Sequence, residues 1–295
     1  MFAAAQSGAF RAVVPTPQLP GAVAVVTGRE AAVGVASPAF GGILFGVARA
    51  LPFLVHAVLY AVSAAVLLAM RTPFQEEREA DRSALRTRLA EGVRFLWDHP
   101  LLRTCALLFG LANFIGPGLM LAIVVIGEAE GLTSGQVGLL LSAFGACVVV
   151  GSFLSPLVRG RLRARGVLLL ELWTWVGCAL FLAWPNVYVL TASILPTALA
   201  IPSTDSVVHS IRYALTPDRL QGRVGSVWIT IGLLIAPLGP LLAGLLLDAF
   251  SERTAIAVFA ACGLALALWG TLSPSLRAAP SVDELVGVGT AAPAR

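Results

Sequence analysis

Residues 101–127 read LLRTCALLFGLANFIGPGLMLAIVVIG, an apolar run in which Arg103 is the only charged side chain. About 20 consecutive apolar residues are enough for a helix to cross the roughly 30 Å hydrocarbon core of a bilayer. A helix at the surface of a soluble protein needs a polar face toward water, and this run offers none. The run therefore predicts a membrane-spanning helix.

The composition of the whole chain agrees with this interpretation. Of 295 residues, 58% are hydrophobic and 12% are charged, whereas about 25% of a typical soluble domain is charged. The net charge of +4 does not indicate a nucleic-acid partner, because the arginines gather at the ends of apolar runs. The four cysteines lie within apolar runs and lack metal-ligand spacing. Since the sequence has no nucleophile elbow, phosphate-binding loop or paired-carboxylate site, we expect no enzyme, cofactor or metal site.

Similar apolar runs recur along the chain and predict an all-α membrane protein of about eight transmembrane helices. Glycine and proline within these runs are ordinary in membrane helices. The expected spans are 22–47, 51–70, 101–127, 136–158, 166–184, 187–209, 224–248 and 254–272.

The distribution of arginine predicts the topology. All 20 cationic residues are arginine, and placing the loop at 71–100 in the cytoplasm puts 17 of them inside. By the positive-inside rule both termini are then cytoplasmic. Arginine without lysine, together with abundant Ala, Gly and Pro, is typical of a GC-rich bacterial genome, so we expect the bacterial cytoplasmic (inner) membrane.

The segment 71–100 is the only long polar stretch between spans. Leu85, Leu89, Val93 and Leu96 follow at helical spacing and predict an amphipathic helix. We expect this helix to lie along the inner membrane surface; a soluble regulatory role is the alternative.

A shift of 202 residues aligns Pro15 with Pro217, Pro38 with Pro240 and Gly42 with Gly244. If the first two spans repeat the last two, the repeat unit is six helices, and four spans are expected upstream of Met1. The DNA upstream of the Met1 codon tests this expectation.

Several stretches resemble the major facilitator superfamily, in particular its branch of enterobactin exporters and macrolide efflux proteins. They are GVASPAFGG (34–42), GVRFLWDHPLLR (92–103), FGLANFIGPGLM (109–120), LVRGRLRARG (157–166) and TPDRLQGRV (216–224). The resemblance implies helices 5–12 of a twelve-helix carrier that lacks its first four. The expected parts are the end of an N-terminal bundle (1–70), a cytoplasmic loop (71–100), a C-terminal six-helix bundle (101–275) and a flexible tail (276–295).

Two residue sets have roles that the resemblance implies. Small residues let helices approach closely, and proline bends a span. In exporters, blocks of glycine and proline seal the interface between the two halves. The resemblance implies this role for Gly34, Pro38, Gly41, Gly42, Gly239, Pro240 and Gly244. The alternative is generic packing.

Cytoplasmic latches between charged groups are implied for Arg159, Arg161 and Arg163 with Glu171, and for Asp218 with Arg223. The alternative is that these arginines only determine topology.

Polar residues within spans are the candidates for the substrate or proton pathway, because a polar group in hydrocarbon usually faces a cavity. Asn113 lies in the middle of a span beside Gly116 and Pro117. Asp205 and His209 share one helix face at i, i+4 and could relay a proton. Structural polar contacts and substrate contacts are the alternatives.

These features together predict a secondary active efflux transporter, a monomer when full-length, that works by alternating access. The resemblance implies amphipathic drugs or siderophore-like molecules as substrates, and we expect proton antiport. The alternative is a truncated, non-transporting membrane fragment from a pseudogene or a misassigned start codon.

Overall fold

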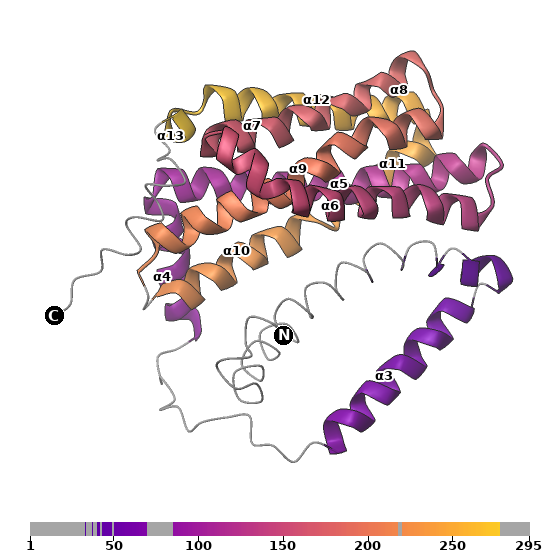
Figure 1. The fold of residues 1–295 in the computed structure, drawn as a ribbon, viewed down its shortest axis with the longest axis horizontal. Helices are drawn as coiled ribbons and strands as arrows, with labels where there is room; N and C mark the ends of the chain where they lie inside the picture. The colour runs from indigo at the N-terminus through magenta and orange to yellow at the C-terminus, as the bar shows by residue number, and fades with distance from the viewer. Residues whose placement is uncertain are drawn as a thin grey trace. The chain divides into compact units, whose positions relative to one another are not determined.

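A computed structural model describes residues 51–69, 85–217 and 220–277, together with residues 33, 37, 40, 41, 43–48 and 50. The elements described are helices (Figure 1). Contacts divide the chain into two units, of which the first comprises residues 1–82 with 134–142 and the second residues 83–133 with 143–295. Each unit is taken by itself below.

In the first unit, helix α3 (Leu51–Ala69) matches the second predicted span. Pro52 lies in its first turn, where a proline removes no helical hydrogen bond. Large apolar side chains project outward around the helix, including Phe53, Leu59 and Val62. Such a surface suits lipid rather than water. The first predicted span, 22–47, lies mostly outside the described residues.

Among the residues described, six helical segments are long and apolar enough to cross a membrane. Five lie in the second unit, and the sixth, Ser134–Arg161, has residues 134–142 in the first unit and the rest in the second. Their ends lie close to those predicted from the sequence. Two of the six segments are interrupted. The segments are α5 (Pro100–Ala129), α6 (Ser134–Arg161), α7 (Ala164–Trp175) with the 3₁₀ turn η2 (Val176–Ala179) and α8 (Leu180–Ala183), α9 (Val187–Leu215), α10 (Gln221–Ile235) with α11 (Leu238–Ala249), and α12 (Glu252–Leu272).

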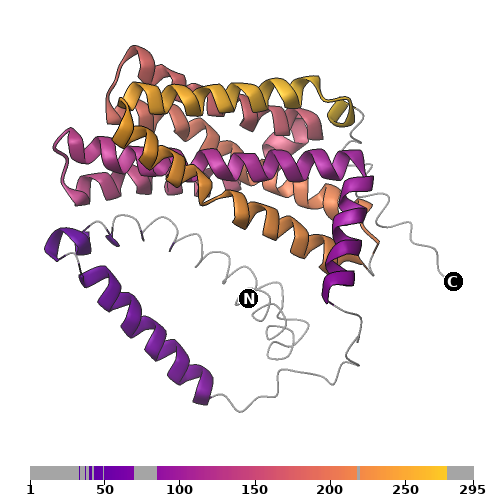
Figure 2. The same cartoon turned by 180° about the vertical axis from the view of Figure 1, so that it is seen from behind.

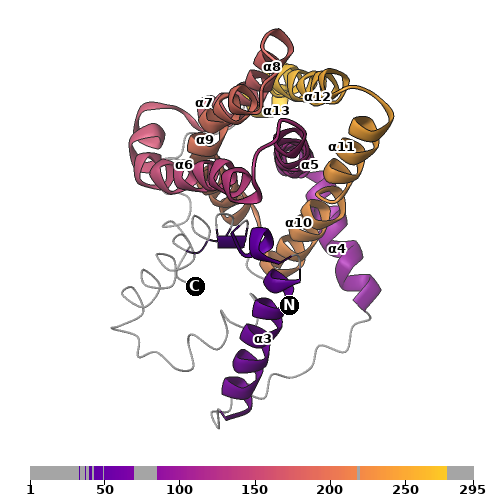
Figure 3. The same ribbon diagram turned by 90° about the vertical axis from the view of Figure 1, so that its right-hand side faces the viewer.

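Helix α5 is the centre of this bundle. It packs against α9, α10, α11 and α12, and the end-on view shows it enclosed by them (Figure 3). Buried residues occur on all of its turns, from Leu102 to Ile126. The apolar run at residues 101–127 therefore forms the core helix of the bundle.

Glycines permit the closest helix contacts. A Cβ on Gly239 of α11 would overlap the Phe114 carbonyl oxygen of α5, and one on Gly118 would overlap the ring of Phe259 of α12. Here backbone or ring occupies the space that any larger residue would need. These contacts hold α11 and α12 against the central helix.

Helix α4 (Leu85–Asp98) confirms the helix predicted in the polar segment. It runs crosswise at one end of the bundle (Figures 1 and 2). Its packing face differs in part from the predicted apolar stripe, because Leu96 is buried but Val93 is 44% exposed. The contact centres on Gly92, where an added Cβ would lie 2.9 Å from the Arg223 carbonyl oxygen of α10. A glycine thus decides which side of α4 meets the bundle.

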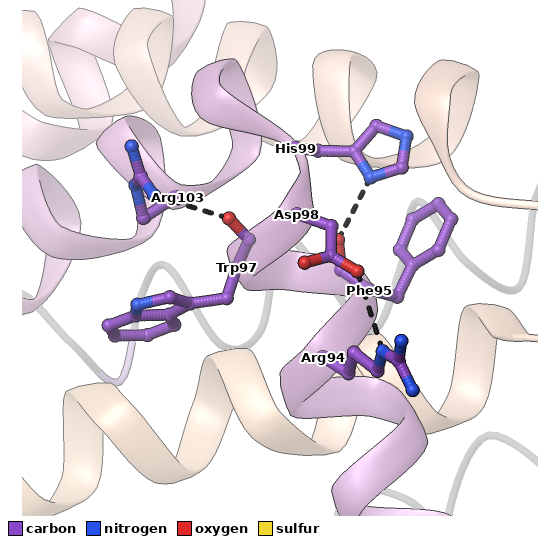
Figure 4. Close-up of polar contacts among 6 residues, drawn as sticks. All are labelled: Arg94, Phe95, Trp97, Asp98, His99 and Arg103. Carbon is purple, nitrogen blue, oxygen red and sulfur yellow. Dashed lines mark hydrogen bonds and ion pairs between the residues drawn. The ribbon is translucent and has the colours of Figure 1, made fainter.

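Local geometry explains the corner between α4 and α5 (Figure 4). His99 precedes Pro100 and adopts an extended conformation, because the proline ring disfavours helical geometry in the residue before it. The Nδ1 of His99 lies 2.9 Å from the Phe95 carbonyl oxygen. Arg103 donates to the carbonyl oxygen of Trp97 at 3.3 Å. These bonds satisfy carbonyls at the end of α4.

Two further polar contacts tie the ends of the bundle helices together. Arg165 of α7 donates to the Thr271 carbonyl oxygen of α12 at 3.1 Å. At the N-terminus of α9, the backbone N–H of Val187 donates to the Glu130 carboxylate at 2.9 Å. A cation at a helix C-terminus and an anion at a helix N-terminus both interact favourably with the helix dipole.

We predict that Gly239→Ala destabilises the bundle by about 1–3 kcal/mol, because α5 and α11 must separate to admit the methyl group. Thermal unfolding in detergent micelles measures this as a lower Tm. Gly244→Ala on the same helix is the matched control, since its Cβ would meet Leu121 at an ordinary 3.9 Å. Equal Tm values for the two variants would contradict the close approach.

Candidate functional site

The second unit contains a cavity of about 580 Å³ lined by α5, α7 and α9, with Phe144 of α6 at one side. Helices α5 and α9 pack together, and so do α7 and α9. The cavity is therefore bounded by three helices, of which α9 packs against both of the others. Its wall is mostly apolar.

Prolines shape the backbone around this cavity. Pro117 of α5 lines the wall and lies inside its helix. Because proline has no N–H, the carbonyl oxygen of Asn113, four residues earlier, loses its helical partner. Pro202 of α9 does the same for Ala198. Each proline therefore removes one backbone hydrogen bond from its helix.

Four polar side chains line the cavity, one from α5, one from α7 and two from α9: Asn113, Glu171, Thr204 and Asp205. Glu171 is 7% exposed, and the Asp205 carboxyl interacts with it electrostatically. Asn113 donates its Nδ2 to the Phe109 carbonyl oxygen at 2.8 Å, so its Oδ1 faces outward from that bond as an acceptor. Among the described lining residues, none is Arg, Lys or His.

Trp175 forms the far wall and is 2% exposed. Its indole lies near Gly116, where an added Cβ would be 3.2 Å from the ring, and its Cβ and backbone lie near Gly263, where an added Cβ would be 3.3 Å from the Trp175 Cβ. The indole N–H and the Thr204 hydroxyl lie beside the Glu171 carboxyl. Neither the Trp175 Nε1 nor the Thr204 Oγ1 reaches hydrogen-bonding geometry.

The structure brings two of the three predicted pathway residues, Asn113 and Asp205, into one cavity. His209 lies one turn further along α9 and does not line it; its ring centroid lies 6.4 Å from that of Tyr213. Glu171 also lines the cavity, although the sequence suggested that it is a latch partner of the basic loop. The sequence did indicate an unusual position for this residue, since Glu171 is the only acid in the apolar run VLLLELW. Trp175 and Thr204 had no such signal.

The other latch candidates have different partners. Arg223 pairs with Glu91 of α4, inside the same unit. Arg159 donates to the Ser155 carbonyl oxygen of its own helix at 3.4 Å. Arg161 and Arg163, like Arg159, form no ion pair with an acid in the described part of the chain. Asp218 lies outside the described residues, and the latch stays a prediction.

Of the predicted gating residues, Gly34, Pro38 and Gly42 lie outside the described residues. A Cβ on Gly41 would meet no atom within 4 Å, whereas Gly239 makes the close contact with α5 described above. Pro240 follows it within α11. The gating role of this set stays a prediction.

Comparison with known proteins adds two findings. The family model described as Major Facilitator Superfamily matches residues 104–289. A solved bacterial homolog of the human lysosomal transporter Spinster, inward-facing and unoccupied, is similar with a TM-score of 0.54 and 18% identity, over 97% of this chain and 71% of that chain. At this identity the similarity concerns the fold alone. No curated protein matches the chain.

We predict that Glu171→Gln stabilises the protein by about 1 kcal/mol, or roughly 2–4 °C in Tm. The reason is that a buried carboxylate beside a second acid, with no cationic side chain on the cavity wall, costs free energy that an amide of the same shape avoids. Thermal unfolding in micelles at neutral pH measures the change. Glu128→Gln, which alters an exposed side chain of α5, is expected to leave Tm unchanged. A lower Tm for Glu171→Gln would show that the carboxylate has a stabilising partner.

Proposed function

Because the chain belongs to the major facilitator superfamily and is a multi-pass membrane transporter, we propose that it exports amphipathic organic molecules in exchange for protons. The superfamily is one of transporters and not of enzymes. Transport in such carriers proceeds by alternating access, in which two bundles rock around a site near the membrane midplane. The substrate, the direction and the coupling ion are the proposed parts.

The observation that carries the proposal is the mostly apolar cavity of about 580 Å³ with two carboxyl groups in its wall. Sites for small organic molecules commonly measure about 300–1,000 Å³ and combine apolar walls with a few polar groups. The space and its lining therefore favour a bulky, largely apolar cargo. A hydrophilic sugar or amino acid would need many more hydrogen-bonding partners than these walls provide.

The carboxyl groups support the coupling to protons. An acid inside a membrane span is costly and usually marks a substrate or proton pathway. Asp205 is half-buried and its carboxyl reaches the cavity. In the proposed cycle this carboxyl binds a proton when the carrier is open to the outside. It releases the proton after the halves have rocked, when substrate enters from the cytoplasm.

The direction of export follows from the proposed topology. The arginine distribution assigns the end of the bundle that carries α4 to the cytoplasm. In this proposal the proline and glycine blocks seal the outer side against leak, and the basic loop with Arg159, Arg161 and Arg163 closes the inner side. Substrate then enters from the cytoplasm or the inner leaflet and leaves outside.

We predict that Asp205→Asn reduces proton-coupled transport to the level of membranes without the chain, because an amide cannot bind and release the coupling proton. Inverted vesicles with an imposed proton gradient provide the assay. Ethidium, chloramphenicol and a catecholate siderophore serve as cationic, neutral and anionic probes. A fluorescent reporter of the gradient registers each exchange.

Asp248→Asn is the matched control, since Asp248 is exposed near the end of α11 and does not line the cavity. It should exchange as the parent chain does. Exchange at the parent rate by Asp205→Asn would remove this residue from the proton pathway. If none of the three probes dissipates the gradient with the parent chain, the proposal of proton-coupled export is wrong.

A further inference from the structure

We propose that the cavity binds an amphipathic organic cation, with the positive charge between Glu171 and Asp205 and the apolar body against Trp175. The proposal deepens the proposed function by naming the charge of the substrate. Its transport role rests on that function, but the binding itself does not. It also distinguishes the two substrate classes that the sequence did not distinguish, amphipathic drugs and siderophore-like molecules, because siderophores of the catecholate type are anionic.

The charge of the cavity is the first argument. Glu171 and Asp205 are the only charged side chains among its described lining residues. In the ligand-free state the Glu171 carboxyl experiences repulsion from the Asp205 carboxyl. In surroundings of low dielectric constant this repulsion is strong. A bound cation relieves the repulsion, whereas a bound anion adds to it.

The hydrogen-bonding groups are the second argument. The wall offers the Asn113 Oδ1, since the amide nitrogen of this side chain is bonded to the Phe109 carbonyl oxygen. Together with the two carboxyls, this acceptor forms a set suited to a positively charged group. An anionic headgroup would need several donors instead.

The unpaired donors beside Glu171 are the third argument. Trp175 is 2% and Thr204 is 9% exposed, yet the indole Nε1 and the hydroxyl Oγ1 lack a hydrogen bond. Buried polar groups without a partner are rare in folded proteins. Both lie beside the Glu171 carboxyl. A cation that fixes this carboxyl in one position allows both donors to bond to it.

The aromatic wall argues for an organic rather than an inorganic cation. Phe109, Phe144 and Trp175 line the cavity, and the faces of aromatic rings attract cations. Trp175 is 2% exposed, so its indole is already packed in the ligand-free protein and little side-chain entropy is lost when a ligand packs on it. A metal ion would leave most of the apolar volume unfilled.

Two probes of the same shape and opposite charge test the proposal: tetraphenylphosphonium and tetraphenylborate. Their binding to the purified chain in detergent micelles is measured by equilibrium dialysis, with protein-free micelles subtracted. We expect tetraphenylphosphonium to bind at least about 10-fold more tightly than tetraphenylborate, because the two carboxyls discriminate by charge. Equal affinities, or no binding of tetraphenylphosphonium, would overturn the proposal.

Variants then locate the site. Glu171→Gln and Asp205→Asn should each weaken tetraphenylphosphonium binding at least about 10-fold, while the exposed control Glu128→Gln should bind as the parent chain does. If Glu171→Gln does not fold, the affinity of Asp205→Asn for tetraphenylphosphonium and the charge preference of the parent chain still test the site. Parental affinity in both cavity variants would place the cation elsewhere and refute the site.

Failure of this inference can be told from failure of the proposed function. Charge-selective binding without proton exchange in vesicles would refute proton-coupled export and leave the cation site standing. Proton exchange with chloramphenicol or the siderophore, without preference for the cationic probe in binding, would refute the cation site and leave export standing.

Discussion

Every backbone N–H and C=O that lies in hydrocarbon must find its partner within the protein, and this constraint governs the whole bundle. Among the described residues it is met by six helical spans. Pro117 interrupts the hydrogen bonding of α5 at the cavity wall, and a 3₁₀ turn follows Trp175 of α7. Irregular backbone at membrane depth is tolerated where it lies within protein or lines a cavity.

The cavity and the tight contacts of the bundle are two sides of one packing arrangement. Gly239 brings α11 onto one face of α5, while Trp175 on α7 fills part of the space at another face. Gly116 leaves room for the indole of Trp175, and Gly263 leaves room for its Cβ and backbone. The cavity lies among α5, α7 and α9, and Glu171 and Asp205 line it.

Much of this architecture could be predicted from the sequence, since the helices α5 to α12 end near the limits of the predicted apolar runs. Asn113 and Asp205, which were predicted pathway residues because a polar group in a span needs a cavity or a partner, both line the cavity, and their role in a pathway stays a prediction. His209 shares a helix face with Asp205 by spacing, yet the wall reaches only Asp205. Glu171 was assigned to the neighbouring arginines because sequence proximity was the only guide to its partner. The contact of α4 with α10 includes Gly92, which is not part of the predicted apolar stripe, and the position of that stripe along the membrane surface stays a prediction.

The sequence by itself determined that this chain spans the membrane many times and where its spans begin and end. These properties follow from composition and from local hydrogen bonding within each helix, which nearby residues settle. The family follows from the match of residues 104–289 to the superfamily. Only the tertiary structure decided which side of each helix faces the cavity, which brought Glu171 to Asp205 and left Trp175 and Thr204 with unpaired donors. The physical reason is that the rotation of a membrane helix about its axis depends on non-local contacts. Here those contacts include the packing of α7, which carries Glu171, on α9, which carries Asp205, and the close approach of Gly177 to the Ser193 carbonyl oxygen of α9.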